Sequence, residues 1–452
     1  MGKTKIDKSK LIFSNHDLKV LLVPLMIQQL LAALMGTVDT VMVSNVGSAA
    51  ISAVSLVDSI NNLMLQVFAA LAAGGTIVCA QYLGKKEPKE CNRAARQVFL
   101  AMFVISVLIM VFCLIFRYPL LRIIFGQVEP DVMEAAQTYF FLTALSYPFI
   151  ALFNANASFF QAEGNTRLPM MVSVLCNFVN IAGNAITIFG LGWGVFGAAL
   201  STLISRILMA VIMMCFQRRD RQVIVIRNYA KIRPDFALIW VILGVGIPSG
   251  IENGMFQFGK LAIQSTVSTL GTTAIAAQAM TIILENLNGI AAMGIGIGLM
   301  TIVGQCIGAG EKEQAVYYVK KLSWISEAVV VGCCLLLFAL TKPITFIAGM
   351  DPASADMCFY MMGWITLVKP IVWVMAFIPA YGLRAAGDVK FSMIVSTISM
   401  WVFRVVLCVY LCRVQGFGPI AVWIGMFVDW TVRGIIFGIR FKSRKWLRHR
   451  VV

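Results

Sequence analysis

The feature that most constrains the fold of this chain is an internal repeat. Residues 24–90 align without a gap on residues 248–314, at a constant shift of 224 positions. Identical pairs occur along the whole alignment and include Pro24 with Pro248, Gly47 with Gly271, Asn62 with Asn286, Gly74 with Gly298 and Gln81 with Gln305. A weaker match follows, between "FQAEGNTR" (160–167) and "LRAAGDVK" (383–390). We therefore predict two homologous halves that fold alike.

The composition places both halves in a membrane. Hydrophobic residues make up 60% of the 452 residues and charged residues only 13%, whereas about a quarter of a soluble domain is charged. Apolar runs of about 20 residues have the length of membrane-spanning helices rather than barrel strands. The N-terminus lacks the apolar core and cleavage site of a signal peptide, so the first run is expected to remain as a span. The runs predict twelve spans, near residues 18–43, 52–82, 94–116, 137–160, 168–190, 195–216, 237–266, 273–305, 322–341, 358–382, 391–412 and 418–440.

The net charge of +16 is explained by membrane topology. If the N-terminus is cytoplasmic, 28 of the 37 Lys and Arg residues fall on cytoplasmic segments. The outer segments then hold only Arg117, Arg122, Lys342, Lys369 and Arg413. The positive-inside rule therefore predicts both termini in the cytoplasm and an even number of spans. It also argues against a nucleic-acid-binding surface, since the basic residues follow the membrane boundaries.

Six spans in each half predict two parallel repeats, related by an axis along the membrane normal. We expect an N-terminal lobe over residues 1–216, a basic cytoplasmic linker over 217–234 and a C-terminal lobe over 235–452. The predicted fold is all-α, with twelve transmembrane helices in two pseudo-symmetric six-helix bundles around a central cavity. Bundles that rock about such a cavity are typical of secondary transporters.

Neither an enzyme nor a metal protein is indicated. The only histidines, His16 and His449, lie at the polar ends, and the eleven cysteines contain no CxxC pair. The segment "GMFQFGKL" (254–261) approaches a phosphate-binding loop, but Leu261 replaces the required hydroxyl residue. We therefore expect transport to be driven by an ion gradient, with no metal site and no cofactor.

Several segments carry a resemblance to a known family. "PLMIQQLLAALMGTVDTVMVSNVG" (24–47), its repeat "PSGIENGMFQFGKLAIQSTVSTLG" (248–271), "FFQAEGNTRLP" (159–169) and "GLRAAGDVKFSM" (382–393) resemble the multidrug and toxic compound extrusion (MATE) family. The resemblance implies a multi-pass antiporter of the cytoplasmic membrane that exports amphiphilic organic cations in exchange for Na⁺ or H⁺. It also implies small-molecule substrates, a lipid bilayer as the surroundings, no nucleic acid, and action as a monomer.

The resemblance suggests which carboxylates couple transport to the ion. Asp39 occupies the place of the acidic residue of the first span, which in the family belongs to the cation-coupling site; the alternative is that it caps a local turn. Glu252 and Glu285 are the candidates in the C-terminal lobe. A structural pair of either with Lys260 is the alternative for both. Asp388 is expected to cap a helix.

Other residues are candidates for the substrate cavity. Asn177, Asn180 and Asn184 share one face of the fifth span, where one branch of the family has an aspartate in place of Asn184. Hydrogen bonding between helices is the alternative role of these amides. The remaining candidates are polar or polarizable residues, suited to varied ligands: Gln28, Met35, Met64, Met255 and Met280.

The arginines within the spans leave a rival function open. Asp429 and Arg433 are four residues apart and predict a structural ion pair. Arg404 either faces the cavity or extends to the membrane surface, and in the cavity it would disfavour a cationic substrate. The rival is a flippase for a lipid-linked precursor from the same superfamily, which would need several arginines in the cavity; only Arg404 and Arg206 are candidates.

Overall fold

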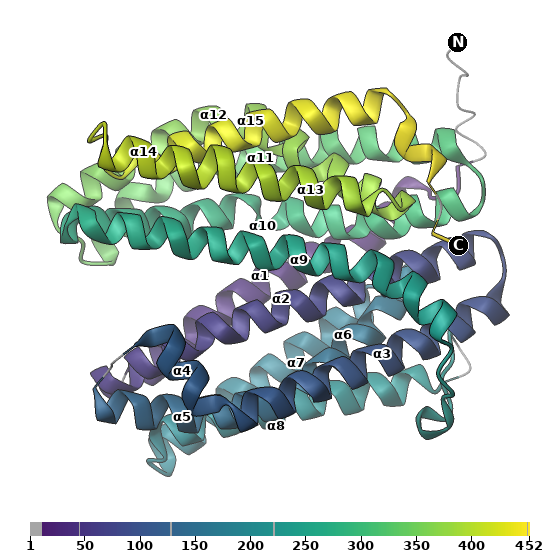
Figure 1. Ribbon diagram of the computed structural model, residues 1–452, viewed down its shortest axis with the longest axis horizontal. Helices are drawn as coiled ribbons and strands as arrows, with labels where there is room; N and C mark the ends of the chain where they lie inside the picture. The colour runs from purple at the N-terminus through teal and green to yellow at the C-terminus, as the bar shows by residue number, and fades with distance from the viewer. Residues whose placement is uncertain (1–10, 45, 127–128, 220–221, 450) are drawn as a thin grey trace. The chain divides into compact units, whose positions relative to one another are not determined.

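The computed structural model describes residues 11–44, 46–126, 129–219, 222–449 and 451–452, without the side chains of residues 34–37, 39–41, 44, 48, 125 and 230. Within this part the chain is helical and contains no strand, as predicted. The described residues contain twelve stretches that are long and apolar enough to cross a membrane, which confirms the predicted number of spans. Figure 1 shows these helices running alongside one another within each half of the chain.

The helices of the N-terminal half begin with two long spans and end with two spans joined by a short turn. They are α1 (Asn15–Ser44), α2 (Ser48–Gly84), α3 (Pro88–Ile115), α4 (Arg117–Phe125), α5 (Pro130–Leu145), α6 (Tyr147–Ala162), α7 (Arg167–Asn184) with the π-helical η2 (Ala185–Gly190), and α8 (Gly194–Gln217). A linker containing the short 3₁₀ helix η3 (Tyr229–Lys231) follows.

The C-terminal half follows the same order of spans, but its third and fourth spans are each one continuous helix. Its helices are α9 (Phe236–Val267) with η4 (Ser268–Leu270), α10 (Thr272–Gly308), α11 (Lys312–Ile347), α12 (Pro352–Ala386), α13 (Val389–Ser399) continued by the π-helical η5 (Met400–Val406) and α14 (Leu407–Arg413), α15 (Ile420–Lys442), and the 3₁₀ helix η6 (Lys445–Arg448). The fourth span is broken between α5 and α6, where Pro148 takes up a first-turn position, whereas α12 continues through Pro370 and Pro379.

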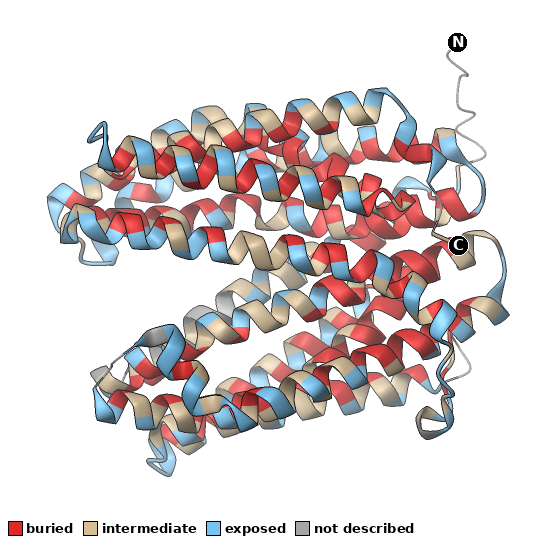
Figure 2. Ribbon diagram, in the orientation of Figure 1, coloured by how far each residue is buried: buried red, intermediate tan, exposed pale blue. Residues whose placement is uncertain are grey.

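By internal contacts, the chain forms two compact units whose limits fall inside α1 and α9. One unit, here the N unit, comprises residues 30–250 and Val452; the other, the C unit, comprises residues 1–29 and 251–451. The first part of α9 therefore packs in the N unit and the first part of α1 in the C unit. Figure 2 shows buried positions alternating with exposed ones along the helices of both halves.

Small residues bring these helices close together. In the N unit, a Cβ atom on Gly74 of α2 would lie 3.0 Å from the backbone nitrogen of Gly246 on α9. In the C unit, a Cβ atom on Gly294 of α10 would lie 2.8 Å from the backbone of Met26 on α1. Such contacts are typical of helix pairs in membranes, where close backbone packing drives association.

Candidate functional site: charged networks inside the two units

The interior of the C unit holds an ion pair between α10 and α12. Lys369 Nζ lies 2.6 Å from Glu285 Oε1 and also donates to the Glu285 carbonyl oxygen at 2.8 Å. Lys369 is fully buried and lies near the rings of Trp373 and Trp430. The expectation that Lys369 belongs to an outer segment is therefore wrong, because α12 runs unbroken on both sides of it.

A second network joins η5 to α15. Asp429 Oδ2 lies 2.6 Å from Arg404 Nη2, and Asp429 Oδ1 lies 2.9 Å from Arg433 Nη2. Ser399 donates a third contact to Asp429 Oδ1 at 2.5 Å. The predicted Asp429–Arg433 pair is present, and Arg404, which is 2% exposed, pairs with the same carboxylate instead of reaching the membrane surface. The π-helical η5 supplies Arg404, and π-helical turns often occur at functional sites.

Basic side chains outnumber acidic ones in this interior. The ring of Phe256 on α9 lies 4.9 Å from the Arg404 guanidinium and 5.0 Å from Lys260 Nζ. Among the described residues of these networks, four cations accompany the two carboxylates of Glu285 and Asp429: Lys369, Arg404 and Arg433, which are buried, and Lys260, which is exposed. The formal excess is two positive charges.

Glu252 and Asp388 have partners that the sequence did not predict. Glu252 Oε1 lies 2.5 Å from Arg384 Nη2, so its partner is not Lys260. Asp388 precedes α13 but does not cap it with its side chain; it accepts instead from Arg440 Nε at 2.7 Å. The expected role of Asp388 as a helix cap is therefore wrong: a nearby arginine of α15 competes with the backbone for its carboxylate.

The N unit contains a carboxylate of a different kind. Asp58 on α2 accepts from Asn61 Nδ2 at 3.2 Å and from the Tyr139 hydroxyl at 3.3 Å, and Tyr147 donates to Asn61 Oδ1 at 2.9 Å. No basic nitrogen lies within 4.0 Å of this carboxylate among the described residues.

Arg206 acts on Asp58 only at longer range, since its guanidinium donates to Ser146 Oγ at 2.7 Å. Asp58 was not among the site residues predicted from the sequence. The sequence does contain a sign of it, because Asp58 is a carboxylate inside an apolar run, the same property that pointed to Asp39.

The asparagines of the fifth span make contacts between helices and along α7. Asn180 Nδ2 donates to Thr202 Oγ1 of α8 at 3.3 Å, and Asn184 Nδ2 donates to Asn180 Oδ1 at 3.4 Å. Asn180 and Asn184 are buried and Asn177 is half-buried. These hydrogen bonds fit the structural alternative for Asn180, which joins α7 to α8.

The remaining candidates are dispersed. Asp39 and Met35 lie in α1, but their side chains are outside the described part of the structure. Gln28, Met64, Met255 and Met280 are half-buried on α1, α2, α9 and α10, and Met280 packs against the hydrophobic core of the C unit. No group of three His, Cys, Asp or Glu residues that could hold a metal ion occurs in the described part of the chain.

Known proteins match this chain in both its internal repeat and its helical fold. The MatE family model matches residues 24–186 and again residues 248–410, two segments separated by the same 224 positions as the internal repeat. The chain belongs to the MATE family. The family members are transporters rather than enzymes.

Two relatives and one solved structure illustrate the similarity. The chain is 28% identical to a probable multidrug resistance protein NorM of Thermotoga maritima, covering 100% of this chain and 97% of the relative. It is 27% identical to an uncharacterized transporter, YisQ, of Bacillus subtilis, covering 94% and 93% of the two chains. A transporter of the MOP superfamily from Pyrococcus furiosus has the same fold, with a TM-score of 0.85 at 20% identity over 95% of each chain.

Proposed function

We propose that this MATE-family protein is a secondary antiporter of the cell membrane, which exports amphiphilic, mainly cationic compounds in exchange for Na⁺ or H⁺. Family membership and the similarity to probable multidrug resistance proteins support export of this kind. In this proposal the chain acts as a monomer with both termini in the cytoplasm, and the two homologous lobes alternate between outward and inward access.

The observation that carries the proposal is that the carboxylates inside the two units have different partners: Glu252, Glu285 and Asp429 are buried and Asp58 is half-buried. In the C unit, Glu252, Glu285 and Asp429 each lie within 2.9 Å of a protein cation. In the N unit, Asp58 is in direct contact only with an amide and a hydroxyl among the described side chains. A carboxylate already neutralised by a buried arginine or lysine must give up that partner before it can bind a proton or Na⁺, at a high cost.

We therefore assign ion coupling to the N-terminal lobe, with Asp39 and Asp58 as the carboxylates that bind the ion. Glu252 and Glu285 can take part only in a state in which Arg384 or Lys369 has moved away. Asn61 and Tyr139 are neutral hydrogen-bond donors, so they stabilise the Asp58 carboxylate without neutralising its charge. Asp58 can therefore bind and release a proton or Na⁺ without first losing a protein cation. Ion binding that lowers the affinity for the substrate gives exchange, because coupling between two sites is reciprocal.

Efflux of ethidium from proteoliposomes tests this function. The vesicles are preloaded with ethidium, and a Na⁺ gradient or a pH gradient is imposed separately on wild type and on Asp39→Asn. We expect one gradient to drive ethidium movement in wild type and Asp39→Asn to abolish that response. Glu134→Gln, which neutralises an exposed carboxylate of α5, serves as the control and should respond as wild type does. Ethidium that moves down its own gradient alone, with no response to either ion gradient, would overturn the assignment as an antiporter.

A second candidate function follows from the excess of cations in the charged networks of the C unit. Lys260, Lys369, Arg404 and Arg433 favour an anionic group on the substrate, as a lipid-linked precursor would have. For the Pyrococcus transporter with the same fold, reverse polarity of the binding pocket is described as suggesting a different function. Parallel efflux assays with ethidium and an anionic dye, and a lipid-reorientation assay, distinguish the two candidates. Movement of the anion or the lipid without ethidium would favour the second.

A further inference from the structure

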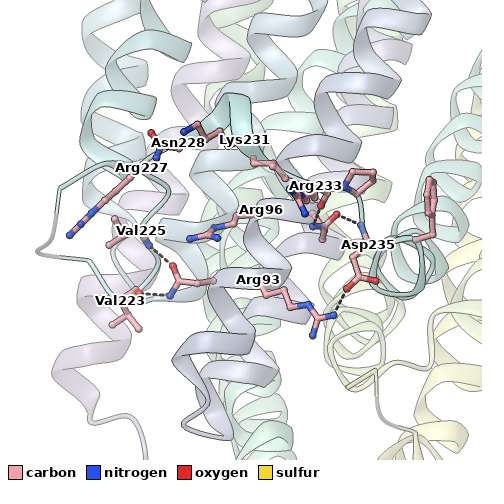
Figure 3. Close-up of a pocket in the computed structure, with 14 residues that line it drawn as sticks. Arg93, Arg96, Val223, Val225, Arg227, Asn228, Lys231, Arg233 and Asp235 are labelled. Carbon is pink, nitrogen blue, oxygen red and sulfur yellow. Dashed lines mark hydrogen bonds and ion pairs between the residues drawn. The ribbon is translucent and has the colours of Figure 1, made fainter.

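The linker between the two halves of the chain forms a basic pocket on the N unit. It encloses about 1070 Å³ between the start of α3 and residues 223–236. Five basic side chains and one carboxylate line it, a formal excess of four positive charges: Arg93, Arg96, Arg227, Lys231, Arg233 and Asp235. Figure 3 shows Arg93 and Arg96 in the middle of the view, with the basic residues Arg227, Lys231 and Arg233 of the linker around them.

Two amides of α3 hold the linker in place, so the pocket is formed in advance of any ligand. Asn92 donates to the carbonyl oxygen of Val223 at 2.9 Å and accepts from the N–H of Val225 at 2.7 Å. Gln97, which is 4% exposed, donates to the carbonyl oxygen of Arg233 at 2.9 Å and accepts from the N–H of Asp235 at 2.9 Å. The linker is therefore attached to α3 at both ends of a loop, and the loop carries Arg227 and Lys231.

The single carboxylate does not neutralise the pocket. Asp235 Oδ2 lies 2.5 Å from Arg93 Nη2, and Glu90 also pairs with Arg93 from outside the pocket, at 3.3 Å. Hydrogen bonds from the backbone at the start of α9, followed by the Arg93 contact, lower the pKa of Asp235, so this carboxylate stays ionised. Arg96, Lys231 and Arg233 remain exposed toward the pocket and have no acidic partner within 4.0 Å among the described residues.

The surroundings of the pocket indicate that its ligand is a lipid. Phe236 lines the pocket and is 69% exposed, and Trp240 follows one turn later on α9 with 68% exposed. On α3, the face that begins with Arg93 and Arg96 continues with exposed apolar residues, including Val104 and Leu108. Basic residues that give way to exposed aromatic and aliphatic ones along two spans are typical of a membrane interface, where headgroups meet acyl chains.

We propose that the linker pocket binds the phosphate headgroup of an anionic phospholipid, whose acyl chains lie along the exposed faces of α3 and α9. Guanidinium groups bind phosphate oxygens in pairs of hydrogen bonds, and several of them converge here. Anionic lipids attract basic segments at the cytoplasmic membrane surface, where the linker is predicted to lie. The linker joins the two halves of the chain, and the bound lipid would hold it against the N-terminal lobe.

Lipid titration followed by native mass spectrometry tests the proposal on the delipidated full-length chain. We expect dioleoylphosphatidylglycerol to bind at least about tenfold more tightly than dioleoylphosphatidylcholine, the effect of one to two basic side chains at a membrane surface. In Arg96→Gln/Arg227→Gln/Lys231→Gln this preference should fall to less than about twofold. Equal binding of the two lipids by wild type, or an unchanged preference in this variant, would overturn the proposal.

Two control variants separate the pocket from general charge. Lys312→Gln/Lys320→Gln/Lys390→Gln removes three exposed charges from the C unit and should keep the wild-type preference. Arg96→Lys/Arg227→Lys/Lys231→Arg keeps the charge of the pocket and should keep most of the preference, which shows that the positive charge at these three positions is what the lipid requires. Loss of the preference in the C-unit control would contradict a specific site.

A last comparison separates a lipid headgroup from a soluble phosphate. Inorganic phosphate is added to the complex with phosphatidylglycerol, against chloride at the same ionic strength, because salt alone screens the pocket. We expect the two salts to displace the lipid equally. Displacement by phosphate at concentrations where chloride has no effect would assign the pocket to a soluble phosphate compound and overturn the lipid assignment.

Discussion

At the scale of single residues, the buried charges of this protein are defined by partners far away in the sequence. Lys369 pairs with Glu285 across 84 positions, and Glu252 pairs with Arg384 across 132. Among the buried ion pairs of the described residues, only Asp429–Arg433 has the four-residue spacing from which a contact can be predicted. The sequence shows which charged residues lie in apolar runs, but it does not show which of them pair. Hydropathy locates a charge in a span and does not say which face of which neighbouring helix that charge meets.

The Lys369–Glu285 pair predicts a specific pattern of stability. Lys369→Met leaves the Glu285 carboxylate buried without a cation and should destabilise the protein by about 3–5 kcal/mol. The double variant Glu285→Gln/Lys369→Met removes both charges and should recover most of this loss. Thermal unfolding in detergent measures both, with Lys320→Met, an exposed lysine of α11, as the control expected to change stability by less than about 0.5 kcal/mol. Equal losses in the single and double variants would contradict a direct pair.

Glu163, in the turn after α6, predicts a dependence of stability on pH. Burial raises the pKa of Glu163 to about 7, although the backbone N–H groups of the linker, including Ile224 at 2.6 Å, donate to it. Because the pKa is higher in the folded state than in the unfolded one, this glutamate favours folding most below the ordinary glutamate pKa. That contribution is lost as the pH rises toward 7.

Glu163→Gln keeps an acceptor for Ile224 but removes the titration. Between pH 5 and pH 8, we expect the unfolding midpoint of wild type to fall by at least about 2 °C more than that of the variant. Glu134→Gln should follow wild type. A wild-type midpoint that does not fall relative to Glu163→Gln would show that burial does not disfavour the ionised carboxylate.

At the scale of helices, glycines allow neighbouring helices of one unit to pack closely. A Cβ atom on Gly246 of α9 would lie 3.2 Å from the Cα atom of Leu71 and 3.0 Å from its side chain, whereas one on Gly244, half a turn earlier, would meet no atom within 4 Å. The repeat identified Gly74 and Gly298 as equivalent positions, but a residue alignment does not show which helix each one contacts.

Gly244 and Gly246, both on α9, provide a matched test. Gly246→Ala should destabilise the protein by about 1–3 kcal/mol, because the methyl group forces α9 away from α2. Gly244→Ala should be neutral or stabilising by up to about 1 kcal/mol, as alanine favours the helix. Thermal unfolding of the two variants measures the difference, and a similar effect at both positions would show that α9 and α2 do not pack closely at Gly246.

At the scale of the whole chain, the sequence predicted the number of spans and the two homologous halves, because hydrophobic runs and the repeat of 224 positions are visible without knowledge of contacts. It placed the lobe boundary at the linker, whereas the contacts of the structure group the first part of each opening helix with the other half of the chain. It did not identify Asp58, whose importance comes from the neutral partners Asn61 and Tyr139, or the basic pocket that α3 and the linker form together.

The most direct test of the account is a comparison of two neutralising changes in the same proteoliposome assay. Asp58→Asn removes the charge of a carboxylate in the N unit. Glu285→Gln/Lys369→Met removes both charges of the Lys369–Glu285 ion pair in the C unit. Ethidium transport is measured with and without the ion gradient that drives wild type. We predict that Asp58→Asn loses at least about tenfold of its response to the gradient, while the double variant keeps most of it. A response that survives in Asp58→Asn but disappears in the double variant would contradict coupling through the N-terminal lobe.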